Sequence, residues 1–171
     1  MNLLRILAIL LFIQFKAYAL IEVDITRGNL NPLPIAVSPL SQTDKSKKTS
    51  QNKLNLENLG LEIAKVIENN LKQSGLFNPL NKDAFLQKPD IAHLKPRFED
   101  WSLIKAQALI TGKVLIENDK LKVEFRLWDV LAAREMLALA FTTVPSNWRR
   151  VGHIITDKVY ERLTGEKGYF D

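Results

Sequence analysis

The last helical pattern of the chain constrains the fold most. Its apolar residues recur at steps of three and four, the spacing of one face of an α-helix. They are Trp148, Val151, Ile155, Val159 and Leu163. Ser146 or Asn147 can supply an N-cap oxygen, and Gly165 lies where a helix end favours positive φ. We therefore expect an amphipathic helix that packs its apolar face against the rest of the domain.

A second amphipathic helix is predicted from Leu56 to Ser74, with Asn55 as its cap and Gly75 as its end. Apolar extended segments at residues 34–39 and 76–80 precede and follow it. This order indicates two parallel strands joined by a crossover helix.

Three further strands are predicted at residues 108–116, 121–127 and 134–144, with an Asn118-Asp119 turn after the first. They form an antiparallel meander. The predicted fold is a mixed α/β domain in the order β-α-β-β-β-β-α, with a five-stranded sheet, two main helices and an anticodon-binding-like shape. We expect residues 81–98 to be a surface excursion, and the apolar residues to suffice for one core.

The first 33 residues carry two other signals. In residues 1–19 a basic residue, an apolar run and Ala17-Tyr18-Ala19 fit a secretory signal peptide; an uncleaved anchor is the alternative. Residues 20–33 then alternate apolar and polar positions before a Gly-Asn hinge. That pattern predicts either the first strand of the sheet or a detachable strand that pairs with an exposed sheet edge.

Composition and motifs argue against several classes of protein. The net charge is +5, and it falls to +3 without the two basic residues of the leader, too little for a nucleic-acid-binding face. The chain has no cysteine and two histidines, His93 and His153, and it lacks the common metal, phosphate-loop and nucleophile-elbow motifs. We expect no enzyme activity, no cofactor and no metal, and we interpret both histidines as structural.

Aromatic residues mark candidate contacts between domains. Trp128 falls on the polar side of its strand, so it needs a cover from this domain or a neighbouring one. Trp148 and the terminal Tyr169 and Phe170 are the other candidates. Arg149-Arg150 oppose the helix dipole, and we expect them to pair with nearby acidic groups.

Segments along the whole mature chain resemble one family. They are residues 34–37 with Pro39, residues 74–80, residues 108–114, residues 126–130 and residues 163–170. In this order and spacing they are similar to the N-terminal domain of TolB, from the periplasmic Tol–Pal system.

The resemblance implies residues 34–165 as the α/β domain and residues 166–171 as the start of a linker to a six-bladed β-propeller. It implies a periplasmic location, a role in outer-membrane integrity and cell division, and peripheral membrane association through partners. Pal would bind mainly through the propeller. The C-terminal domain of TolA would bind the N-terminal segment by strand addition. The corresponding residues are Ile21, Glu22, Val23, Asp24, Ile25, Thr26, Arg27 and Gly28.

The sequence departs from the family pattern in two places. Asp24 and Arg27 are charged where the family segment is uncharged, and Ala132-Ala133 replace the usual glycine before the last strand. Two other classes stay open. One is a secreted α/β module that binds anionic lipid or glycan through the Lys45–Lys53 loop. The other, disfavoured by the signal peptide, is a nucleic-acid binder of anticodon-binding-like shape.

Overall fold

The computed structural model describes Ile21, residues 31–42 and residues 58–171. The strands are β1 (Leu33–Val37), β2 (Ser41–Gln42), β3 (Phe77–Pro79), β4 (Ala108–Glu117), β5 (Lys120–Asp129) and β6 (Arg134–Thr143). The helices are α2 (Leu59–Gln73), α3 (Pro89–Ala92), α4 (Phe98–Leu103) and α5 (Trp148–Thr164), with 3₁₀ turns η3 (Lys82–Ala84) and η4 (Pro145–Asn147).

One mixed sheet joins all the described strands, in the order β3-β1-β4-β5-β6. β1 runs parallel to β3 and to β4, whereas β4, β5 and β6 are antiparallel neighbours. The predicted parallel crossover and the predicted meander are therefore confirmed. The two-residue β2 also pairs with β4, further along the strand than β1, and makes the sheet six-stranded.

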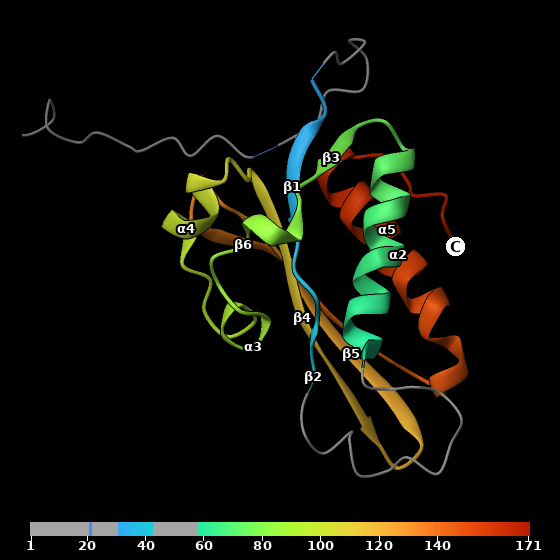
Figure 1. The fold of residues 1–171 in the computed structure, drawn as a ribbon. Coiled ribbons are helices and arrows are strands. Elements are labelled where there is room, and N and C mark those ends of the chain that lie inside the picture. Colours follow the sequence, from blue (N-terminus) through green and yellow to red (C-terminus); the bar gives the residue numbers. More distant parts are fainter. Residues whose placement is uncertain (1–20, 22–30, 43–57) are drawn as a thin grey trace, which may run out of the picture.

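The main hydrophobic core lies between the sheet and the helices α2 and α5, which lie side by side on one face (Figure 1). The predicted stripe of α5 faces this core, with Val151, Ile155, Val159 and Leu163 buried. The two helices approach closely at Gly152. A Cβ atom there would lie 2.8 Å from Val66 Cγ1, closer than packed carbon atoms come. The described sheet and helix pair confirm the predicted fold class.

A second hydrophobic cluster covers part of the opposite face of the sheet. Its buried members are Ala36, Ala92, Trp101, Ala106, Leu109 and Val130. They come from β1, from β4, from the residue that follows β5 and from residues 81–106, which hold η3, α3 and α4. The prediction of a single core was wrong. Because neighbouring β1 and β4 lie in the middle of the sheet, their apolar runs require cover on both faces.

The predicted helix ends are confirmed, but one predicted cap is not. Gly75 and Gly165 have φ values of 73° and 76° after α2 and α5. At the start of α5, however, neither predicted residue caps the helix. Ser146 belongs to η4, and the Asn147 side chain makes no cap hydrogen bond. The Asn147 amide instead donates to Thr143 Oγ1 at 3.1 Å. Asn55, the predicted cap of α2, lies outside the described residues.

Candidate partner-binding and domain-interface sites

The predicted partner-binding segment lies almost entirely outside the described residues. Only Ile21 is described, and its half-buried side chain packs against the main core. Glu22–Gly28 and the lysine loop Lys45–Lys53 fall outside. What the structure does show is where the segment joins the domain. It leads into β1, which is flanked by β3 and β4, so both sides of that strand are occupied.

The cover over Trp128 comes from this domain. The Phe98 ring of α4 packs edge-on against the Trp128 ring, with centroids 5.8 Å apart. The indole Nε1–H donates to Thr111 Oγ1 at 2.8 Å, which satisfies the polar atom of a half-buried side chain. Of the two covers considered for this tryptophan, the intradomain one is present.

Trp148 opens α5 and lies half-buried against the main core. The Arg149 guanidinium stands over its ring, 4.6 Å from the centroid, in cation–π geometry. The neighbouring Arg150 points to the C-terminal residues and pairs with Asp171, so the expected acidic partner is found for one of the two arginines.

The C-terminal residues fold back along α5 and place their aromatic rings on Tyr160. Phe170 and Tyr169 stack with centroids 4.4 Å apart, and both pack edge-on against the Tyr160 ring. Phe170 also contacts the main core, while Tyr169 remains 64% exposed. Of the two terminal aromatics, Phe170 anchors the segment and Tyr169 presents an open surface.

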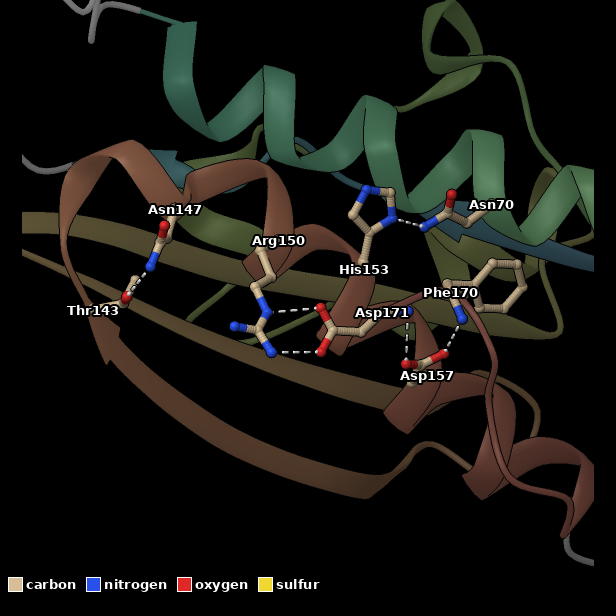
Figure 2. A network of polar contacts seen from close by, with 8 residues as sticks. All are labelled: Asn70, Thr143, Asn147, Arg150, His153, Asp157, Phe170 and Asp171. Atoms are coloured by element: carbon tan, nitrogen blue, oxygen red, sulfur yellow. Dashed lines mark hydrogen bonds and ion pairs between the residues drawn. The ribbon is translucent and has the colours of Figure 1, made fainter.

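Polar contacts fix the same residues to α5 (Figure 2). The Asp157 carboxylate accepts the backbone N–H of Phe170 at 2.8 Å and that of Asp171 at 3.2 Å. Arg150 donates to both carboxylate oxygens of Asp171, at 2.9 and 3.1 Å. The hydrogen bonds from Arg150 lower the pKa of Asp171, and the same carboxylate raises the pKa of Arg150.

His153 belongs to a contact between the two large helices. Its Nδ1 lies 2.9 Å from the amide nitrogen of Asn70 on α2, as Figure 2 shows. Asn70 also donates to Thr156 Oγ1, which donates in turn to the Gly152 carbonyl. These contacts give His153 a hydrogen-bond partner within the domain, as a structural role would require, and that interpretation stays a prediction.

Two features of the described residues bear on metal and ligand binding. In that part of the chain no three histidine, cysteine or acidic side chains gather closely enough to hold a metal ion. A shallow hollow of about 140 Å³ on the outer face of the sheet carries mixed charges. It is lined by His93, Leu94, Gly112, Lys113, Glu124 and Arg126. Over the same described ranges, no helix combines the length and apolar character of a membrane span.

The described residues thus define a small mixed α/β module with two docked helices and an anchored C-terminal tail. Residues 21–136 match the family model of the TolB amino-terminal domain. The chain belongs to this family. It is 75% identical over 170 residues to the Tol-Pal system protein TolB of Pelagibacter ubique. The match covers 99% of this chain but only 38% of that relative.

Solved structures agree with this fold. TolB from Acinetobacter baumannii superposes with a TM-score of 0.61 at 22% identity, over 81% of this chain and 30% of that one. A hypothetical protein of Chlamydia trachomatis, CT253, superposes with a TM-score of 0.55 at 12% identity, over 80% of this chain and 100% of its own. At these identities the likeness concerns the fold alone.

Proposed function

We propose that this protein is a periplasmic, non-enzymatic interaction module of the Tol–Pal system. Residues 20–31 bind the C-terminal domain of TolA by adding a strand to one of its sheet edges. Through that contact the module contributes to outer-membrane integrity and to envelope constriction at cell division. Binding of Pal requires a propeller domain, and the present chain spans only 38% of its TolB relative.

The observation that carries the proposal is the position of this segment in a TolB-type chain. An alternating run, Ile21 to Thr26, stands immediately before the domain. The described central strands β1, β4 and β5 each have neighbours on both sides, so the sheet does not need this run to fill its middle. An alternating strand that its own sheet can do without is suited to pairing with an edge on another protein, where main-chain hydrogen bonds supply the affinity.

The test is calorimetric titration of the chain with the TolA C-terminal domain. Deletion of residues 20–31 should abolish binding while leaving the domain folded. A pair of substitutions at Ile25 separates the main-chain from the side-chain contribution to TolA binding. Ile25→Pro removes a backbone donor and should weaken binding about tenfold or more, whereas Ile25→Ala keeps the donor and should weaken it less.

The lysine loop supplies the control. Replacing Lys45, Lys47, Lys48 and Lys53 with glutamine should leave TolA binding unchanged. Undiminished TolA binding by the deleted chain would reject the proposal. If the loop variant instead lost affinity for vesicles of anionic lipid that the parent chain binds, the lipid-binding alternative would take its place.

A further inference from the structure

The strongest unassigned feature is the way a single side chain holds the backbone of the C-terminal tail, residues 167–171. The two carboxylate oxygens of Asp157 each accept one backbone N–H, from Phe170 and from the next residue, Asp171. Hydrogen bonds to an ionised acceptor are about twice as strong as neutral ones. Because the carboxylate binds main-chain groups, it recognises the path of the tail rather than its side chains.

The tail also fits the helix closely at Gly168. A Cβ atom at this position would lie 2.6 Å from Asp157 Cβ, so there is no room for a side chain. Only Gly75 and Gly165 have positive φ among the described glycines, so the backbone at Gly168 is open to any residue. The requirement for glycine here is therefore a requirement for close approach to α5.

Two further contacts hold the tail on either side of Asp157. Tyr160, one turn later on α5, receives the rings of Tyr169 and Phe170. Arg150, two turns earlier, donates two hydrogen bonds to the carboxylate of Asp171. The tail thus runs antiparallel to the helix, and Asp171 lies between the side chains of Asp157 and Arg150.

We propose that Arg150, Asp157 and Tyr160 form a docking surface for the tail along α5, which we call the docking track. Asp157 binds the tail backbone, Tyr160 packs against the two aromatic rings and Arg150 pairs with the Asp171 carboxylate. The track fixes where the tail leaves the domain. In a longer TolB chain, the residues after this point would start from the surface of α5 between Asp157 and Arg150, close to the exposed ring of Tyr169. Docking of the tail is independent of TolA binding.

Hydrogen exchange of the chain, measured residue by residue by NMR, tests the track. The amides of Phe170 and Asp171 should be protected in the parent chain. Asp157→Ala should reduce their protection about tenfold or more, the factor expected for a lost hydrogen bond to a charged group. Gly168→Ala changes only the tail and leaves α5 intact, and it should release the same two amides.

The control is Glu62→Ala, which removes the same charge from an exposed ion pair on α2 without a contact to the tail. It should leave the protection of Phe170 and Asp171 unchanged. The track is refuted if these amides exchange freely in the parent chain. It is equally refuted if they stay protected in both Asp157→Ala and Gly168→Ala.

Discussion

Ala133 occupies a backbone conformation that an alanine rarely adopts. Its φ is 51°, in the left-handed region, at the turn between β5 and β6. This is the turn where the family resemblance led us to expect a glycine. A left-handed residue with a Cβ atom costs roughly 1–2 kcal/mol. The replacement of glycine therefore affects the stability of the turn rather than any partner contact.

Replacing this alanine with glycine should stabilise the domain. Ala133→Gly relieves the Cβ strain, and the extra backbone entropy of glycine in the unfolded chain offsets about 0.5–1 kcal/mol of that gain. We expect a net increase of about 0.5–1 kcal/mol in the free energy of unfolding, measured by urea denaturation. The neighbouring Ala132 lacks a positive φ, so Ala132→Gly serves as the control and should destabilise. Equal effects of both substitutions would contradict the strain argument.

At the scale of elements, Gln87 organises the layer that covers the second core. The side chain is 3% exposed, and its oxygen accepts the Trp101 indole N–H at 3.1 Å and the Arg97 backbone N–H at 2.9 Å. Its amide nitrogen donates to the Lys95 carbonyl at 3.0 Å. One buried amide thereby joins the segments on either side of α3 and sets α4 against the sheet.

Removal of this amide should loosen the layer without unfolding the sheet. Gln87→Ala leaves the buried Trp101 indole N–H without a partner and removes two part-buried hydrogen bonds to the backbone of Lys95 and Arg97, and we expect a loss of about 2–3 kcal/mol in unfolding free energy. Hydrogen exchange should rise mainly in residues 87–106. The exposed Gln73 at the end of α2 provides the matched control, since Gln73→Ala removes an amide that faces solvent. If exchange rose uniformly over the whole chain, Gln87 would be part of the main folding unit rather than of a separable layer.

For the whole molecule, surface ion pairs predict how stability depends on pH. Hydrogen bonds lower the pKa of Asp171 through Arg150, of Glu124 through Lys122, and of Glu161 through Lys158. A carboxyl whose folded pKa lies below its unfolded pKa stabilises the fold above that unfolded value. The contribution is lost as the pH falls through the folded pKa. The pKa values of Arg150 and Lys122 are raised, so the stability that these two cations contribute persists through neutral pH.

We therefore expect the urea midpoint to be level from pH 7 to about pH 5 and to decrease below that. High salt should weaken the trend, since these groups are solvent-exposed. In Arg150→Gln the decrease should be shallower, because Asp171 then titrates near its ordinary pKa in both states. An identical acid slope in the variant and the parent would exclude a contribution from the Arg150–Asp171 pair.

The sequence predicted the sheet, the two large helices and their glycine ends, because those follow from local periodicity and backbone preference. It also identified Trp128 as a residue that needs a cover. It missed the second core, because Ala36, Trp101 and Val130 come from segments far apart in the chain and have no shared period. The sequence did identify the aromatic rings of the tail as candidate contacts. It did not identify Asp157, because that residue lies within a helix and binds backbone groups of a segment that follows later in the chain.

The order of secondary structure and the membership of a TolB-type family were thus contained in the sequence itself. Which face of the sheet each segment covers, and which helix receives the tail, was decided only by the tertiary structure. The reason is that periodicity records which side of an element is apolar, whereas the partner of that side depends on contacts between residues distant in the chain.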